Sequence, residues 1–119
     1  MDERPFFVVE AYTKSAVDPI MFNKGDTLVI GELYQDDPEW PGWIWCCHPI
    51  TGKAGWVPQQ YLRIQDRQGI ALCDYSANEL TVLPGDTLLV STQENGWAWA
   101  QNTSDEYGWV PLRHIQPII

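Results

Sequence analysis

Basic residues are scarce in this 119-residue chain, which has seven Lys and Arg against 16 Asp and Glu and a formal net charge of −9. Nucleic-acid binding depends on Lys and Arg that contact phosphates, and anionic membrane surfaces attract the same residues. The composition therefore argues against both classes of partner. Acids outnumber bases in both halves of the chain, which favours a neutral or basic protein or peptide partner.

Long apolar runs are also missing. No stretch approaches the roughly 18 apolar residues that a membrane span requires, and the start, "MDERPFFVVE", is acidic with a short apolar run. A secretory signal needs a basic segment followed by a longer apolar one. We therefore expect a globular, cytoplasmic protein.

Cysteine is rare and odd in number, with only Cys46, Cys47 and Cys73 in the chain. Adjacent cysteines have poor geometry for a disulfide between strands, and in a strand they point to opposite faces, so they cannot share a metal ion. Phosphate-binding glycine loops are absent too, because "KGD" at 24–26 and "PGD" at 84–86 are turn signals with no helical pattern after them. The sequence predicts reduced thiols, no metal site and no cofactor.

Tryptophan, in contrast, is abundant, with seven residues that help to reveal an internal repeat. Four blocks recur in one order: "VVEAY" at 8–12 and "ALCDY" at 71–75, "KGDTLVI" at 24–30 and "PGDTLLV" at 84–90, "GWIWCC" at 42–47 and "GWAWAQ" at 96–101, "AGWVPQQYLRI" at 54–64 and "YGWVPLRHIQP" at 107–117. The boundary falls near the polar stretch at 63–69. The sequence predicts two domains, 1–65 and 69–119, joined by a short linker.

Each repeat is all-β by pattern. Short runs of Val, Ile, Leu, Trp and Tyr alternate with Gly, Pro, Asp and Asn, and no helical period lasts ten residues. The segments "VPQQYL" and "VPLRHI" suit a single 3₁₀ turn each. About five short strands in each repeat predict two small five-stranded barrels in tandem.

The tryptophan-bearing strands alternate between large and smaller side chains. Because successive residues point to opposite faces, one face of these strands belongs to the core. We expect a small inward set made of Ile44, Cys46, Ala98 and Ala100. The tryptophans then face outward. We expect Trp43 and Trp97, which directly follow loops, to meet partners, and Trp45 and Trp99 to pack where the two repeats join.

The ordered blocks resemble the Src-homology-3 (SH3) family, including bacterial variants of that fold, over nearly the whole chain and twice. The resemblance implies a five-stranded barrel that holds extended, often proline-rich peptides in an aromatic groove. The groove residues carried over are Tyr12, Trp43, Pro58 and Tyr61 in the first repeat and Tyr75, Trp97, Pro111 and His114 in the second. Glu10 and Cys73 stand where the family has its first tyrosine, and His114 stands where it has the last.

The resemblance also implies an acid that meets a basic residue of the ligand. Glu79 matches that position in the second repeat, whereas the first repeat has Pro19 there, preceded by Asp18. We expect Asp18 or the acids of the loop at 36–39 to supply the charge in the first repeat. The loop that follows Tyr75 is short for the family, which favours the first repeat as the main peptide-binding one.

A catalytic interpretation depends on one pair only. By family geometry Cys73 and His114 would be neighbours in the second groove, but the sequence offers no clear third residue to orient the imidazole. We therefore expect a protein that is not an enzyme.

Three classes of function stay open at this point. The first is a stand-alone adaptor that binds extended or proline-rich segments of a partner protein, mainly through the first repeat. The second is a structural or assembly element whose grooves are occluded by packing of one barrel on the other. Binding of cell-wall peptides is a third, which the lack of an export signal disfavours. Exposure of Trp43 separates the first two.

Overall fold

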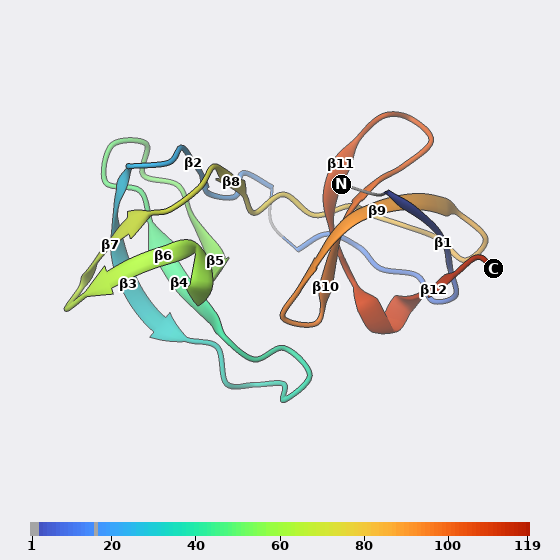
Figure 1. Cartoon of the computed structure of the whole chain (residues 1–119), viewed down its shortest axis with the longest axis horizontal. Coiled ribbons are helices and arrows are strands. Elements are labelled where there is room, and N and C mark those ends of the chain that lie inside the picture. Colours follow the sequence, from blue (N-terminus) through green and yellow to red (C-terminus); the bar gives the residue numbers. More distant parts are fainter. Residues whose placement is uncertain (1–2, 16) are drawn as a thin grey trace. The chain divides into compact units, whose positions relative to one another are not determined.

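The computed structural model describes residues 3–15 and 17–119 as an all-β protein with two short 3₁₀ turns (Figure 1). The chain divides into two compact units. Unit 1 comprises Met1–Val17 and Asn78–Ile119, and unit 2 comprises Asp18–Ala77. Within the described residues, no helix has the length and apolar character needed to cross a membrane.

Unit 1 contains a five-stranded sheet in the order β11-β10-β9-β1-β12. Its elements are β1 (Arg4–Val8), β9 (Thr87–Glu94), β10 (Trp97–Gln101), β11 (Tyr107–Pro111), η2 (Leu112–His114) and β12 (Ile115–Pro117). All the pairs in this sheet are antiparallel. Strand β1 comes from the first repeat, and the four other strands come from the second.

Unit 2 mirrors this arrangement with the order β5-β4-β3-β7-β6. Its elements are β2 (Met21–Phe22), β3 (Thr27–Leu33), β4 (Trp43–Cys47), β5 (Ala54–Pro58), η1 (Gln59–Tyr61), β6 (Leu62–Gln65), β7 (Gln68–Ala71) and β8 (Tyr75–Ser76). Strands β7 and β8 come from the second repeat. Strand β7 lies between β3 and β6, and β8 pairs with β2.

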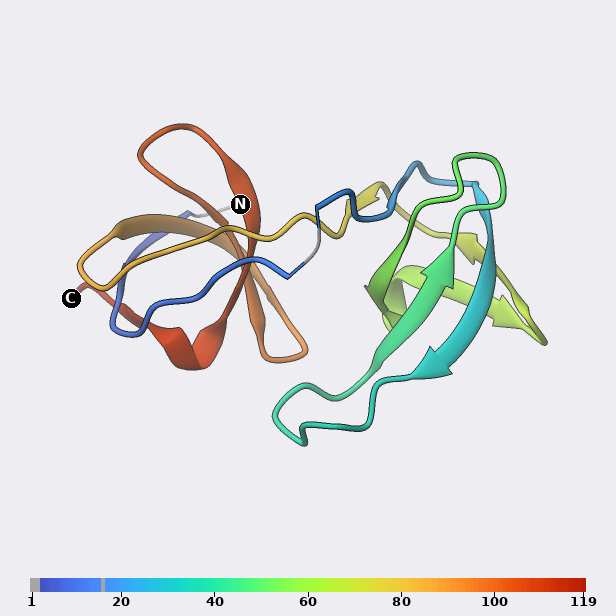
Figure 2. The same cartoon turned by 180° about the vertical axis from the view of Figure 1, so that it is seen from behind.

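The two repeats have thus exchanged their opening segments. Strand β1, dark blue in Figure 1, runs beside β9 and β12, and Tyr12 pairs with Val82. Strand β7 runs beside β3 and β6, and β8 runs beside β2. The view from behind shows the same two crossings of the chain between the units (Figure 2), at residues 17–18 and 77–78. The predicted boundaries 1–65 and 69–119 follow the repeats in the sequence, whereas the compact units combine parts of both.

Each exchanged segment makes the equivalent main-chain hydrogen bond to the repeat that receives it. The Val8 N–H donates to the Asp86 carbonyl over 2.9 Å, and the Ala71 N–H donates to the Asp26 carbonyl over 2.9 Å. Gly25 and Gly85 adopt φ of 92° and 96° in the turns that the sequence predicted. That conformation suits glycine, which has no Cβ to clash there.

Both units contain buried apolar side chains on their strands. The predicted inward set is confirmed, because Ile44, Cys46, Ala98 and Ala100 are all 8% exposed or less. In unit 1 the apolar core consists of Phe6, Val8, Leu80, Val82, Leu88, Val90, Ala98, Ala100, Val110 and Ile115. Phe6 and Val8 come from the first repeat, so the core of unit 1 is built from both repeats.

The three cysteines are free, with Cys46 buried and Cys47 and Cys73 half-buried. Burial, with a smaller effect of the neighbouring Cys47, raises the pKa of the Cys46 thiol from 9.0 to about 12. Because the thiolate is the nucleophile, a shift of this size leaves about a thousandfold less of it at any pH below 9.

We expect iodoacetamide at pH 8 to modify Cys47 and Cys73 and to leave Cys46 unmodified until the protein unfolds. Peptide mass mapping over time measures the three rates, and a urea-unfolded sample provides the control in which all three react. Modification of Cys46 in the folded protein at the rate of Cys47 would contradict the buried placement. Because folding raises the pKa of the Cys46 thiol, the stabilisation from keeping this thiol protonated in the core is fully present below pH 9. It is lost as the pH rises toward 12.

Candidate functional site: two aromatic sets

Because the repeats exchange their opening segments, the residues that the sequence assigned to one groove per repeat come together in different combinations. Tyr12 lies in unit 1, where its ring centroid is 5.5 Å from that of Trp97 and 5.6 Å from that of His114. Tyr75 lies in unit 2, edge-to-face with Tyr61 at 5.5 Å. Each tyrosine therefore joins the aromatic residues of the opposite repeat, so grouping in space differs from grouping by repeat.

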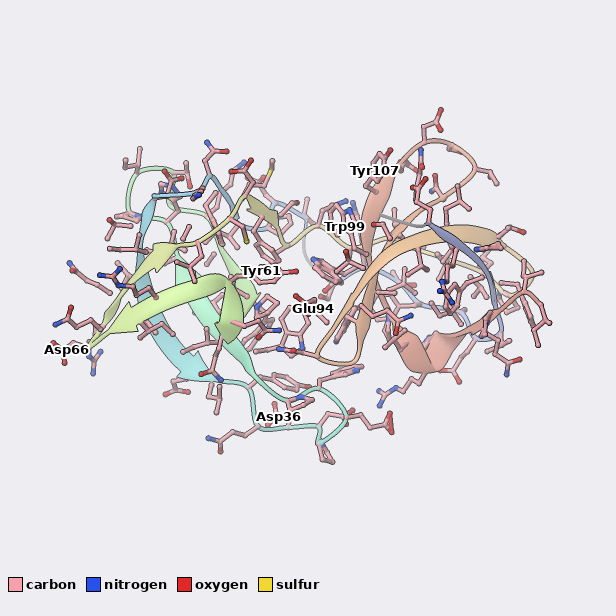
Figure 3. All side chains as sticks on the ribbon, in the orientation of Figure 1. Asp36, Tyr61, Asp66, Glu94, Trp99 and Tyr107 are labelled. Atoms are coloured by element: carbon pink, nitrogen blue, oxygen red, sulfur yellow. The ribbon has the colours of Figure 1, made fainter. Side chains whose placement is uncertain are left out.

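We define the unit 2 aromatic set as Trp43, Pro58, Tyr61 and Tyr75. Trp43 begins β4 and lies directly opposite Pro58, the last residue of β5. The 3₁₀ turn η1 then places Tyr61, visible in Figure 3, next to β8 and its Tyr75. The Leu72 N–H donates to the Tyr61 carbonyl over 2.9 Å, which fixes the turn against the strand from the second repeat.

Tyr75 is anchored within unit 2. Its hydroxyl donates to the Trp56 carbonyl over 2.8 Å, and its ring stacks on Phe22 with centroids 5.2 Å apart. Only 8% of the residue is exposed. Tyr61 is half-buried, so it is the member of the pair that offers more of its ring to solvent.

We define the unit 1 aromatic set as Tyr12, Trp97, Pro111 and His114. Trp97 lies opposite Pro111, as Trp43 lies opposite Pro58. The 3₁₀ turn η2 ends at His114. The unit 1 aromatic set is thus built from the same strand pair and turn as the unit 2 set. The prediction of one 3₁₀ turn after each "VP" pair is confirmed.

A side-chain contact between Glu10 and His114 distinguishes unit 1 from unit 2. Nε2 of His114 lies 3.0 Å from Oε2 of Glu10, and Nδ1 lies 3.3 Å and 3.1 Å from the carbonyl oxygens of Glu10 and Ala11. Both ring nitrogens thus face oxygen acceptors in the segment from the first repeat. Glu10 and His114 stand at two positions where the family has tyrosine, so the two residues that replace those tyrosines in unit 1 contact each other.

Glu79 also acts inside unit 1. Its Oε1 accepts hydrogen bonds from the Tyr12 hydroxyl at 2.8 Å, the Ser15 N–H at 2.9 Å and the Ser15 hydroxyl at 3.1 Å. That oxygen holds the segment at 12–15 against the one at 78–82. The sequence associated Glu79 with Tyr75, but the structure brings it to Tyr12.

Asp18 lies at the start of unit 2 and pairs with Lys53, with its Oδ1 3.1 Å from Nζ. Both side chains are exposed, at 74% and 37%, so this surface pair contributes little to stability. The acids of the loop at 36–39 belong to unit 2 as well, and Asp36 is marked in Figure 3.

The four strand tryptophans differ from the expected order of exposure. Trp43 and Trp97 are 6% and 8% exposed, whereas Trp45 is 39% exposed and Trp99 is half-buried. Trp45 packs edge-on against Trp56, with ring centroids 5.0 Å apart. Trp99 packs against Trp109 at 5.3 Å and against Tyr107 at 6.4 Å, and Trp99 and Tyr107 are labelled in Figure 3. Each unit therefore carries a second aromatic cluster made by cross-strand pairs.

The Cys73 and His114 pair considered from the sequence has its two members in different units, Cys73 in unit 2 and His114 in unit 1. The imidazole of His114 is directed to residues 10 and 11, as described above. Among the described residues, no group of three or more His, Cys, Asp and Glu side chains is arranged to hold a metal ion.

One hydrogen-bonded contact between a histidine and a carboxylate was not foreseen. Nε2 of His48, which is 7% exposed, lies 3.2 Å from Oδ2 of Asp26. The Ile50 N–H donates to Nδ1 of His48 over 3.2 Å, so the Nε2 proton faces the carboxylate. A hydrogen bond from the Asn23 backbone, followed by the one from His48, lowers the pKa of Asp26. This pair secures the turn before β3 rather than a binding site.

Comparison with known families accounts for both repeats. A variant SH3 domain model matches residues 5–65, and an SH3 domain model matches residues 70–112. The chain belongs to the SH3 family. It is also similar to human intersectin-1, with 22% identity over 136 aligned positions that cover 93% of this chain and 7% of intersectin-1. The SH3 pair thus spans a small fraction of the length of that relative.

No solved structure matches the SH3 pair significantly. SH3 domains are protein-interaction modules that bind proline-rich peptides, and they are typically not catalytic. The all-β fold expected from the repeats is confirmed, with two five-stranded sheets.

Proposed function

We propose that this SH3 pair binds an extended, proline-containing segment of a partner protein through the unit 2 aromatic set. The observation that supports the proposal is the edge-to-face pair of Tyr61 and Tyr75 beside the cross-strand pair of Trp43 and Pro58. Rigid aromatic side chains stack on proline rings at little entropic cost, and Tyr61 is the member of the set that offers the most of its ring for such stacking. The exchange leaves these four residue types together in unit 2.

Unit 1 takes a smaller part in this proposal. Its two tyrosine positions carry Glu10 and His114, which contact each other, and Glu79 is engaged by Tyr12 and Ser15. An acid that accepts three internal hydrogen bonds has less to offer a basic residue of a ligand. Unit 2 carries eight acidic and four basic side chains, a net charge of −4, which suits a neutral or basic segment.

The wider role that we propose is a cytoplasmic, non-catalytic adaptor. The acidic composition and the aromatic sets support it, as does membership of a family of protein-interaction modules. The second candidate is a structural or assembly element, and one observation favours it: Trp43 and Trp97 are almost fully buried.

An NMR titration that follows the seven tryptophan indole signals tests the proposal. A pool of proline-rich and mixed extended peptides should shift the Trp43 signal. Tyr61→Ala should weaken binding about tenfold, because it removes the most accessible ring of the set. His114→Ala changes the equivalent position of unit 1 and is the matched control, with binding retained. Absence of shifts, with the Trp43 indole protected from solvent exchange, would support the structural candidate.

A further inference from the structure

The exchanged strands place very different side chains at one equivalent core position. Phe6 of β1 lies opposite Leu88, and Gly69 of β7 lies opposite Leu28. Leu28 and Leu88 occupy the same place in the two repeats, so Phe6 and Gly69 are equivalent. Two residues later the difference continues with Val8 in unit 1 and Ala71 in unit 2, which are 1% and 2% exposed. The first repeat therefore supplies a strand with large core side chains, Phe6 and Val8, which we call the bulky strand. The second repeat supplies a strand with small ones, Gly69 and Ala71, which we call the slim strand.

The cores that receive these strands differ in the opposite sense. Four buried positions of unit 1 carry small side chains, and their equivalents in unit 2 carry larger ones. The pairs, unit 1 first, are Val82 and Phe22, Val90 and Ile30, Ala98 and Ile44, Ala100 and Cys46. The bulky strand thus enters the core with small residues, and the slim strand enters the core with large ones.

The opposite assignment, in which each strand completes its own repeat, fits poorly. A Cβ added to Gly69 would lie 2.7 Å from Cδ1 and 3.3 Å from Cγ1 of Ile30. A methyl group there already displaces the tip of Ile30, and the phenyl ring of Phe6 requires far more room. In the other core, Gly69 and Ala71 would leave the space now filled by Phe6 and Val8 empty, which is also unfavourable.

We propose that these complementary core volumes select the exchanged arrangement, so that the segment at 4–8 recognises the core of the second repeat and the segment at 68–71 recognises the core of the first. Each core holds one such strand, so one segment can return only if the other returns as well. The exchange is one reciprocal event. Both aromatic sets are present only in the exchanged arrangement, because Tyr12 and Tyr75 belong to the same chain segments as the exchanged strands.

Cysteine pairs can report which arrangement is present in the full chain. Phe7 lies directly opposite Thr87 in unit 1. In an arrangement without exchange, Phe7 would lie opposite Thr27, the equivalent of Thr87. Directly opposed positions are close enough for a disulfide. In a Cys47→Ser, Cys73→Ser background, we expect mild oxidation to link F7C with T87C and to link F7C with T27C at least about tenfold less.

Transplanting the core side chains between the strands tests the cause. The combined variant F6G, V8A, G69F, A71V gives the slim pattern to the first repeat and the bulky pattern to the second. It should reverse the result, so that F7C links to T27C and the link to T87C falls about tenfold. F6G alone and G69F alone should each be less stable to urea than the combination, because only the combination fills both cores without exchange.

The outcomes separate clearly. A folded transplant variant that still links F7C with T87C would show that core volumes do not decide the arrangement. An unfolded transplant variant would also count against the proposal, since the arrangement without exchange should then be as well packed as the exchanged one is now. The readout is a covalent link and needs no ligand, so it is independent of the proposed peptide binding.

Discussion

Phe6→Ala should unfold unit 1 selectively, although Phe6 precedes the whole second repeat by more than 60 residues. The side chain is 7% exposed and belongs to a core formed otherwise by Val8 and eight residues of the second repeat. Loss of a buried phenyl ring costs about 3–5 kcal/mol, which is a large part of the stability of a unit this small. Hydrogen exchange should accelerate in β10 and β11.

Phe7→Ala is the matched control for this variant. Phe7 is the next residue of β1, points away from the core and is half-buried, so its loss should change exchange much less. The strands β4 and β5 of unit 2 should keep their protection in Phe6→Ala. Accelerated exchange in β4 and β5 instead of β10 and β11 would mean that Phe6 packs within its own repeat, contrary to the structure.

Gly108→Ala is expected to have a comparable effect on the same unit. A Cβ at Gly108 would lie 2.7 Å from the Glu79 carbonyl carbon and 2.8 Å from the Leu80 nitrogen. Both are backbone atoms, which cannot rotate away as a side chain can. The segment at 78–80 is held to β11 by main-chain hydrogen bonds from the Trp109 N–H to the Asn78 carbonyl and from the Leu80 N–H to the Trp109 carbonyl, and these would have to lengthen.

Overpacking of this kind costs about 1–3 kcal/mol, and we expect the upper end because backbone must move. Urea unfolding followed by tryptophan fluorescence measures the change. Gly55→Ala changes the equivalent glycine of unit 2, where the nearest atom is the Ile20 Cγ2 methyl at 3.0 Å, so its cost should be smaller. Equal costs at the two glycines would contradict the close backbone approach in unit 1.

Much of the local structure was predictable because it depends on neighbouring residues. Strand alternation identified the inward residues Ile44 and Ala98, and the proline of each "VP" pair identified the 3₁₀ turns. The repeat and the family resemblance identified the all-β fold and the residue types of the aromatic sets. These inferences need only the period of a strand and the conformation of a few residues.

The exchange was not predictable in the same way. The opening segments of the two repeats carry the same β pattern, so either could enter either sheet, and periodicity does not distinguish the two choices. The difference lies in core volumes spread over distant residues, such as Phe6 with Val90 and Gly69 with Ile30. The pairing of Glu10 with His114 and of Tyr12 with Glu79 follows only after the exchange is known.

Burial of Trp43 and Trp97 was the other departure from the prediction. Strand alternation says which face of a sheet a side chain occupies, but exposure also depends on what covers that face. Both residues lie opposite the buried prolines of the closing strands. The titration described above therefore decides between the two proposed functions more directly than the sequence could.

The most direct test of the shared construction of the two units is the set of nuclear Overhauser contacts made by the ring of Phe6 in the unmodified protein. The exchanged arrangement predicts contacts from this ring to the methyl groups of Leu88, Val90 and Ala98, which share its buried core. Contacts from the ring to the methyl groups of Leu28, Ile30 and Ile44 would contradict it, because they would place the opening strand back in its own repeat.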